Sequence, residues 1–169
     1  MAAKIKKTQQ TKKQKRSKEM GKYYHKKTER DGIIFDSQTE AEYYDELTSL
    51  KKKGIIRKFT MQDEFILQDK YILADGKCFN ASDYSEKDFK KLQKKYPKCT
   101  VQAIKYISDF IVEYTDGIIK VIDVKGVKTP DFKIKEKMFN YRYPQYGGLV
   151  CMVKVKSKWM TYEDKKKAK

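Results

Sequence analysis

Histidine and cysteine are scarce in this sequence, and their scarcity argues against several kinds of catalytic site. The chain has one histidine, His25, which lies in a basic N-terminal stretch. This counts against a zinc hydrolase, an HNH-type nuclease and a serine–histidine hydrolase, because each needs histidine as a base or a metal ligand. The three cysteines, Cys78, Cys99 and Cys151, are odd in number, and no pair has metal-ligand spacing. We therefore expect reduced thiols in a cytoplasmic compartment.

Long apolar runs are also missing. No stretch approaches the roughly 18 apolar residues of a membrane-spanning helix, and the first residues lack the hydrophobic region of a signal peptide. We therefore expect a soluble, unsecreted protein that makes no membrane contact. At 169 residues the chain has the length of one domain with a substantial core.

Positive charge is abundant, and most of it lies at the two ends. The net charge is +17, of which residues 1–27 carry +10 and residues 156–169 carry +4, leaving +3 for residues 28–155. We expect a basic arm over residues 1–27 that is disordered when unbound, a folded domain over residues 28–155, and a basic tail over residues 156–169. Such ends bind nucleic acid without sequence preference by releasing counterions. The alternatives are a solubilising or targeting role, or attraction to anionic lipid.

The clearest helix is predicted between Ser37 and Gly54. Ser37 suits the N-cap, and Glu40 lies three residues later, at the spacing of a capping box. Apolar residues recur at helical spacing in between, and Gly54 is a natural stop. Glu40 also shares a helical face with Tyr44 and Leu47, so it lies at the edge of the buried stripe. A capping role and a role at a site are therefore both open for Glu40.

A β-hairpin is predicted over residues 106–125. Its turn is Asp116-Gly117, a dipeptide that tolerates the positive φ of a tight turn. Asp123 and Lys125 point to the same face of the second strand, roughly 6–7 Å apart. Asp109 lies among apolar residues of the first strand, where an unpaired charge is costly. Two aspartates and a lysine on adjacent strands suggest a metal site with a charged helper.

A second helix is predicted from Pro130, with Thr129 as its N-cap. It is followed by an apolar strand over residues 149–155. Residues 69–104, which include a short basic amphipathic helix, are interpreted as an excursion from the main sheet. The predicted order is therefore helix, strand, hairpin of two strands, helix, strand. This order indicates an α/β fold with a mixed β-sheet flanked by helices.

Three acids and one lysine could form a metal-dependent hydrolytic site. They are Glu40, Asp109, Asp123 and Lys125. Two carboxylates about 4 Å apart repel by roughly 4 kcal/mol at an effective dielectric constant near 20, and a divalent cation removes that cost. Mg²⁺ prefers oxygen ligands and could polarise a phosphodiester and orient a water. Lys125 could deprotonate or orient that water, or stabilise charge on phosphorus. The competing interpretation is a buried ion pair in which Lys125 simply neutralises the aspartates.

Basic residues follow the candidate centre directly. Gly126 either turns the chain or lets the backbone approach a phosphate. Lys133 and Lys137 share one helical face, with Lys135 nearby and Lys128 just before the helix. Such a run is most often a solvated helix face. Its position after the centre favours contacts with nucleic-acid phosphates.

These residues together resemble the PD-(D/E)XK nuclease superfamily. The pattern is a helix-borne Glu40, then Asp109, a spacer of thirteen residues, and Asp123-Val124-Lys125. Three segments are most similar to a family of small phage-encoded proteins placed in that superfamily: TERDGIIFDSQTEAEYYDEL, YISDFIVEYTDG and VIDVKGVKTPDFKIKEKMF. The resemblance covers most of residues 28–155, with residues 69–104 as an insertion. Ser108 departs from the motif's proline, and the second acid is Asp rather than Glu.

The resemblance implies a restriction-endonuclease-like core with the order αβββαβ. It also implies that Asp109 and Asp123 bind Mg²⁺, for which Mn²⁺ could substitute, that Glu40 completes or supports the metal site, and that Lys125 is the catalytic lysine. Gln62 lies where relatives often place a polar residue, so it is a candidate supporting residue. Resolvases of this superfamily act as dimers, so the resemblance also implies a homodimer.

The leading functional hypothesis is a Mg²⁺-dependent DNA endonuclease, selective for DNA structure in the manner of a phage Holliday-junction resolvase. It would act in the cytoplasm of a bacterial host. One alternative is a transposon-end or restriction-type nuclease that needs a protein partner for specificity. Another is a non-catalytic, basic nucleic-acid-binding protein, which would bind in a salt-sensitive manner without needing metal.

Overall fold

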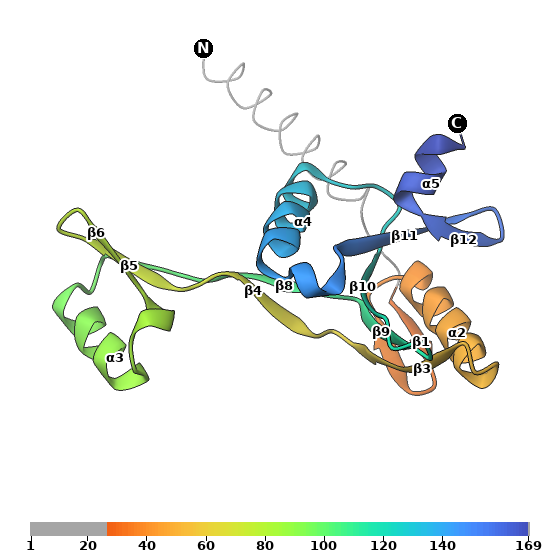
Figure 1. Ribbon diagram of the computed structural model, residues 1–169, viewed down its shortest axis with the longest axis horizontal. Coiled ribbons are helices and arrows are strands. Elements are labelled where there is room, and N and C mark those ends of the chain that lie inside the picture. Colours follow the sequence, from red (N-terminus) through yellow and green to blue (C-terminus); the bar gives the residue numbers. More distant parts are fainter. Residues whose placement is uncertain (1–26, 169) are drawn as a thin grey trace, which may run out of the picture. The chain divides into compact units, whose positions relative to one another are not determined.

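A computed structural model of the chain describes residues 27–168. Its contacts divide the chain into two units, residues 1–44 and residues 45–169. Helix α2 (Gln38–Lys52) begins in the first unit and ends in the second. Figure 1 shows the elements coloured in chain order. The basic arm expected over residues 1–27 lies outside the described residues except for Lys27, so it stays a prediction.

The described part of the first unit is a short hairpin followed by the start of α2. Strands β1 (Thr28–Arg30) and β2 (Ile33–Phe35) pair antiparallel. Asp31 and Gly32 join them with φ values of 51° and 77°, the left-handed conformation of a two-residue hairpin turn. Tyr44 ties the hairpin to the helix, because its Oη donates to Asp31 Oδ2 at 3.0 Å.

Helix α2 begins and ends at the predicted signals. Ser37 Oγ accepts the N–H of Glu40 at 3.2 Å and donates to Glu40 Oε1 at 2.8 Å. Leu47 is fully buried, as the apolar periodicity predicts. Gly54 follows the last turn with φ 70°, which satisfies the usual need for a left-handed residue at a helix end.

The second unit is built on a five-stranded sheet in the order β12-β11-β10-β9-β3. Only β10 and β11 are parallel, and the other neighbours are antiparallel. In chain order the strands are β3 (Ile56–Met61), β9 (Phe110–Tyr114), β10 (Ile119–Val124), β11 (Leu149–Val155) and β12 (Lys158–Thr161). The mixed α/β class predicted from the sequence is confirmed.

Helix α4 (Pro130–Arg142) and the short turn η3 (Pro144–Tyr146) make the crossover that the parallel pair β10–β11 requires. Thr129 caps α4 as predicted, with its Oγ1 accepting the N–H of Phe132 at 3.2 Å. Phe132 and Phe139 are buried in one apolar cluster with Val121 of β10. Because side chains alternate along a strand, Asp123 points to the same face of β10 as Val121.

The first strand of the predicted hairpin is broken, which corrects the expected position of Asp109. Strand β8 (Ile104–Ile107) pairs with β4 (Glu64–Gln68), whereas β9 pairs with β10 and β3. Asp109 lies at the junction between β8 and β9 rather than within a strand. The β3–β4 connection bends with it, because Gln62 N donates to Asp109 O at 3.4 Å and Ser108 N donates to Asp63 O at 3.0 Å.

Residues 69–104, which we call the lobe, form a small sheet of their own in the order β6-β5-β7. The elements are β5 (Tyr71–Ala74), β6 (Lys77–Asn80), η2 (Ala81–Asp83), α3 (Glu86–Lys95) and β7 (Thr100–Val101). Asp75 and Gly76, with φ values of 53° and 69°, turn the chain between β5 and β6. Ile72, Ala74 and Phe89 form a separate buried cluster, so the lobe has its own apolar core.

The expected basic tail over residues 156–169 is instead structured in its described part. Strand β12 extends the main sheet beside β11, and helix α5 (Tyr162–Lys167) follows it. Thr161 caps α5 by accepting the N–H of Asp164 at 3.1 Å. Tyr162 packs against the main apolar cluster. The high lysine content of this segment gave no sequence signal for a strand, yet β12 covers the open edge of β11. The fold therefore extends beyond residue 155.

Candidate active site

A cavity of about 380 Å³ lies in the second unit, lined by residues of β4, β8, β10 and α4 and of the segments that follow or precede them. Its charged lining residues are the acids Glu64, Asp109, Asp123 and Asp131 and the lysines Lys105, Lys125 and Lys135. The structure therefore brings together three of the four predicted catalytic residues. One of the predicted phosphate contacts, Lys135, lines the same cavity.

Asp123 is the most enclosed charged group of the cavity, with 1% of the residue exposed. Tyr106 Oη donates to its Oδ1 at 2.9 Å. Lys125 Nζ also donates to Oδ1 at 2.9 Å and lies 2.8 Å from Oδ2 without hydrogen-bond geometry. Oδ2 is the single buried side-chain N or O atom in residues 27–168 that takes part in no hydrogen bond. A buried carboxylate oxygen without a hydrogen bond is unusual, and the Lys125 ammonium 2.8 Å away balances its charge.

Lys125 is held as a cation beside Asp123. Burial by itself lowers the pKa of Lys125, but the nearby charge of Asp123, the hydrogen bond to it and the charge of Asp109 outweigh burial and raise that pKa above its ordinary value. The ammonium also lies 4.8 Å from the centre of the Phe132 ring, within cation–π range. At neutral pH this side chain is therefore suited to stabilise negative charge rather than to accept a proton.

Tyr106 was not among the predicted site residues. Burial, followed by the charge of Asp123 and the hydrogen bond to it, raises the pKa of Tyr106 well above its ordinary range. The phenol therefore stays neutral and serves as a hydrogen-bond donor to the carboxylate. Its side chain faces inward because β8 pairs with β4, a pairing that no local pattern in the sequence indicates.

Asp109 links two neighbouring strand ends. Its Oδ2 accepts the N–H of Val124 at 2.6 Å, so the carboxylate reaches from the β8–β9 junction to the end of β10. Asp109 is partly buried and borders the same cavity as Asp123. The break between β8 and β9 thus turns Asp109 toward the end of β10.

The two aspartates of the cavity are a small set of candidate ligands for a metal ion. Within the described part of the chain, no group of three or more His, Cys, Asp or Glu residues is arranged to hold a metal. Mg²⁺ needs fewer protein ligands, because it keeps several waters and is often bound by one or two carboxylates. Asp109 and Asp123 both border the cavity, and their role as Mg²⁺ ligands stays a prediction.

Glu40 belongs to the unit of residues 1–44, whereas the cavity belongs to the unit of residues 45–169. Within its own unit Glu40 contacts Ser37 in the first turn of α2, which is the capping role considered from the sequence. Its role as a third acid at the metal site stays a prediction.

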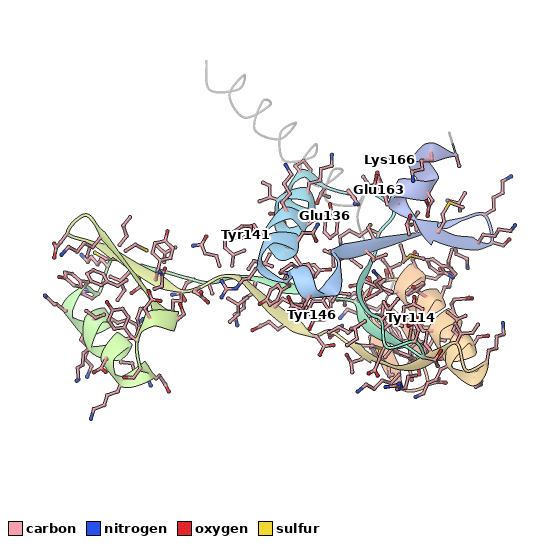
Figure 2. All side chains as sticks on the ribbon, in the orientation of Figure 1. Tyr114, Glu136, Tyr141, Tyr146, Glu163 and Lys166 are labelled. Carbon is pink, nitrogen blue, oxygen red and sulfur yellow. The ribbon has the colours of Figure 1, made fainter. Side chains whose placement is uncertain are left out.

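Lys128 is enclosed by protein rather than displayed on the surface. Its side chain is 7% exposed, and its Nζ lies 2.6 Å from Glu136 Oε1 and 3.4 Å from Glu163 Oε1. Figure 2 labels Glu136 on α4 and Glu163 on α5. We call Lys128, Glu136 and Glu163 the ion-pair cluster. Because the Lys128 ammonium is enclosed and ion-paired within the fold, it is not displayed for the phosphate contact predicted from the sequence.

The remaining predicted residues occupy different places. Lys133 and Lys137 are exposed on α4, and Lys135 is half-buried, 3.7 Å from Asp131. A β-carbon at Gly126 would meet no atom within 4 Å, so packing does not require glycine there. Gln62 is exposed and contributes its backbone N–H to Asp109 rather than a side chain to the cavity.

Glu64 and Lys105 are additional charged residues of the cavity that sequence reasoning missed. They lie on the paired strands β4 and β8, with Lys105 Nζ 2.8 Å from Glu64 Oε1. Neighbouring residues of a strand face opposite ways, which places Glu64 on the face opposite Phe65, but residues 65–67 are all apolar, so the local sequence gives only a weak signal. The position of Glu64 near the aspartates depends on the pairing of β4 with β8.

The sheet and the cavity define a mixed α/β protein in which a buried aspartate pairs with a partly exposed lysine at the end of a central strand. Residues 20–161 match the model of a family described as "Protein of unknown function (DUF1064)", and the chain belongs to that family. Neither the curated proteins nor the solved structures include a match. In residues 27–168, no helix combines the length and apolar character needed to cross a membrane.

Proposed function

We propose that this protein is a metal-dependent DNA endonuclease of the PD-(D/E)XK kind, which hydrolyses phosphodiester bonds. The observation that carries the proposal is the cavity shared by Asp109, Asp123 and Lys125, in which a buried carboxylate oxygen takes part in no hydrogen bond. A strand-end aspartate with a lysine two residues later is the pattern on which the resemblance depends. When β1, β2, the elements between β3 and β9, η3 and the elements after β11 are set aside, the order α2, β3, β9, β10, α4, β11 is compatible with the order αβββαβ.

The charge balance of the cavity supports a metal and a phosphate together. Four acids and three lysines line it, which leaves one net negative charge when all are ionised. A divalent cation and one phosphodiester anion together add one positive charge, so the occupied cavity would be neutral. Asp109, Asp123 and Lys125 account for this one net negative charge, because Glu64 is balanced by Lys105 and Asp131 by Lys135.

Four residues of the cavity divide into three roles. Asp109 and Asp123 would hold Mg²⁺ or Mn²⁺, which when bound polarises the phosphodiester and lowers the pKa of a water. Lys125 carries a positive charge and would stabilise the negative charge that develops on the phosphate. Tyr106 holds the Asp123 carboxylate in position from β8.

The substrate class rests on the resemblance and on charge. The net charge of +17 favours a polyanion. A four-way DNA junction is the preferred candidate substrate, and a homodimer is the corresponding assembly. A nuclease of the transposon-end or restriction type, dependent on a protein partner for specificity, is the alternative within the same chemistry.

A second candidate is a nucleic-acid-binding protein without catalysis. The observation that favours it is the ion pair of Asp123 with Lys125, which neutralises the buried charge without a metal. Metal-dependent stability separates the two candidates, because a ligand that binds only the folded state raises the unfolding free energy by about 2.7 kcal/mol at 100 times its dissociation constant. We expect Mn²⁺ to raise the melting temperature of the wild type and not that of Asp123→Asn.

Cleavage of DNA is the decisive test. The protein is incubated with Mg²⁺ and four-way junction, duplex or single-stranded DNA, and the products are resolved on a denaturing gel. We expect the wild type to cut the junction and Asp123→Asn to lose activity by at least about 100-fold, because loss of a charge-stabilising group at such a site costs roughly 3 kcal/mol or more.

The matched control is Asp116→Asn, which removes one negative charge from the turn of the same hairpin. Asp116 is exposed and its Oδ1 accepts the N–H of Ile118 at 3.0 Å, an interaction that asparagine preserves. Its activity should equal that of the wild type. If the wild type cuts no DNA, alone or with added host extract, or if Asp123→Asn cuts equally well, the nuclease proposal is wrong.

A further inference from the structure

The lobe of residues 69–104 takes no part in the cavity, yet it is a built module rather than a loose loop. Ile72, Ala74 and Phe89 form its buried core. Its base is held by Arg142 of α4, whose Nη2 donates to both carboxylate oxygens of Asp69 at 2.8 Å. Because the lobe is folded and its two ends join β4 and β8, which line the candidate nuclease cavity, it could contact the same substrate at a second place.

Helix α3 of the lobe carries its lysines on one side. At about 100° of rotation per residue, the five lysines of the helix fall within an arc of about 140°. They are Lys87, Lys90, Lys91, Lys94 and Lys95, and all are exposed. Phe89 points in the opposite direction, into the core of the lobe. We call this set of five residues the α3 lysine face.

Acidic residues neutralise only part of the α3 lysine face. Glu86 lies 2.5 Å from Lys90, and Asp88 lies 2.9 Å from Lys91, both in the first turn of the helix. Lys87 and Lys94 form no ion pair within residues 27–168. Helix α3 therefore carries five lysines against two acids, and its surplus positive charge faces solvent.

The direction of the apolar side chains of α3 distinguishes between two possible partners, an anionic membrane surface and a nucleic acid. A helix that binds a membrane surface inserts its apolar face among the lipids. In α3 that face is already used, because Phe89 is 6% exposed and Leu92 packs against the same cluster. The phosphate backbone of a nucleic acid requires only the exposed cations and makes no demand on the apolar face.

We propose that the α3 lysine face is a binding site for the phosphate backbone of duplex DNA. An α-helix fits the major groove of a DNA duplex, and the lysines contact phosphates without reading bases. The site deepens the proposed function, since it names a second contact for the same substrate, and it predicts binding without sequence preference. The N-terminal arm would add to the same electrostatic attraction.

The test is DNA binding by the full chain in EDTA, so that cleavage cannot occur. The variant Lys87→Gln/Lys91→Gln/Lys94→Gln removes three charges with a residue of similar helix propensity. Its matched control is Lys51→Gln/Lys52→Gln/Lys53→Gln, at the exposed end of α2, which has the same net charge. Anisotropy of a labelled duplex of arbitrary sequence is measured over a range of salt concentrations, and circular dichroism checks that each variant is folded.

We expect the α3 variant to bind the duplex roughly tenfold or more weakly than the wild type at moderate salt, and its salt slope to fall by up to about three. The α2 control should keep the slope of the wild type. The variant Lys87→Arg/Lys91→Arg/Lys94→Arg should bind normally, because phosphate contact depends on charge. Equal weakening of both glutamine variants, or no weakening of either, would overturn the inference.

Two further comparisons separate the inference from its alternatives. Vesicles of phosphatidylcholine and phosphatidylserine in equal parts serve as the lipid probe. A variant that loses vesicle binding but keeps duplex binding would assign the face to a membrane surface and overturn the proposal. DNA cleavage that persists with unchanged binding by the α3 variant would refute this site and leave the nuclease intact. If the wild type never cuts DNA but the α3 variant binds DNA more weakly than the wild type, the α3 binding site would be supported and the nuclease proposal would not.

Discussion

At the scale of single residues, the feature that dominates the molecule is the carboxylate of Asp123. A charge that is 1% exposed needs strong compensation, which Tyr106 and Lys125 supply at one oxygen and Lys125 alone approaches at the other. The arrangement is self-consistent without a metal, but it leaves Oδ2 without a hydrogen bond. The two interpretations differ at this oxygen: the metal-binding interpretation expects a metal ion to bind it, and the ion-pair interpretation expects Lys125 to be its sole partner.

Tyr106→Phe tests how much the site depends on this network. The substitution removes the hydroxyl that donates to Asp123 and leaves a buried acceptor with one donor fewer, so we expect a loss of roughly 1.5–3 kcal/mol in the free energy of unfolding. Urea denaturation measures it. Tyr141→Phe is the matched control, because Tyr141 is 91% exposed (Figure 2) and its hydroxyl should contribute nothing measurable. Equal stability of the two variants would contradict the role given to Tyr106.

At the scale of elements, the ion-pair cluster joins the segment after β10 to two helices. Lys128 precedes α4, Glu136 lies within α4, and Glu163 lies in α5. Lys128 Nζ also lies 6.0 Å from the centre of the Phe132 ring, whose ring Lys125 approaches as well. Lys128, which the sequence suggested as a phosphate contact, therefore positions the segment that follows Lys125.

Lys128→Met separates a role in packing from a role in DNA binding. Methionine preserves the length of the side chain but leaves Glu136 without its partner, so we expect a destabilisation of roughly 1–3 kcal/mol. Lys133→Met, on the exposed face of the same helix, should stay within about 0.5 kcal/mol of the wild type. Urea denaturation gives the stability and anisotropy gives the salt slope for DNA. A normal stability with a reduced slope for Lys128→Met would restore the phosphate contact predicted from the sequence.

At the scale of the whole molecule, many lysines that the sequence suggested were in a tail or an excursion lie on folded elements. The lysine-rich C-terminal segment contributes β12 to the main sheet and α5 beside it. The lobe places a second group of lysines on a module with its own core. Much of the positive charge of residues 27–168 therefore lies on helices and strands.

Truncation after Val155 tests where the fold ends. The shortened chain loses β12 and α5 and exposes the edge of β11, so we expect a clear fall in melting temperature and aggregation during size-exclusion chromatography. Truncation after Ala168 is the matched control and should behave as the full chain. A shortened chain that stays monodisperse with an unchanged melting temperature would show that residues 156–169 are not needed for the fold, as the interpretation of this segment as a basic tail implies.

Local patterns determined a large part of this protein. The caps at Ser37 and Thr129, the helix stop at Gly54 and the turn at Asp116-Gly117 depend on residues close in the chain, and the structure has them where predicted. The spacing of Asp123 and Lys125 also sufficed to predict that they share one face of a strand, because alternation along a strand is a local rule. The predicted partnership of Asp109 with them followed from the hairpin and its turn.

Tertiary structure alone decided the rest, since pairing between strands far apart in sequence has no local signature. The choice of β4 as the partner of β8 broke the predicted strand at Asp109 and brought Tyr106, Glu64 and Lys105 to the cavity. Packing of α5 against the main cluster enclosed Lys128 in ion pairs. The sequence by itself therefore determined which side chains could form a hydrolytic centre, and the fold decided which neighbours surround that centre, because those neighbours come from strands and helices that meet only after folding.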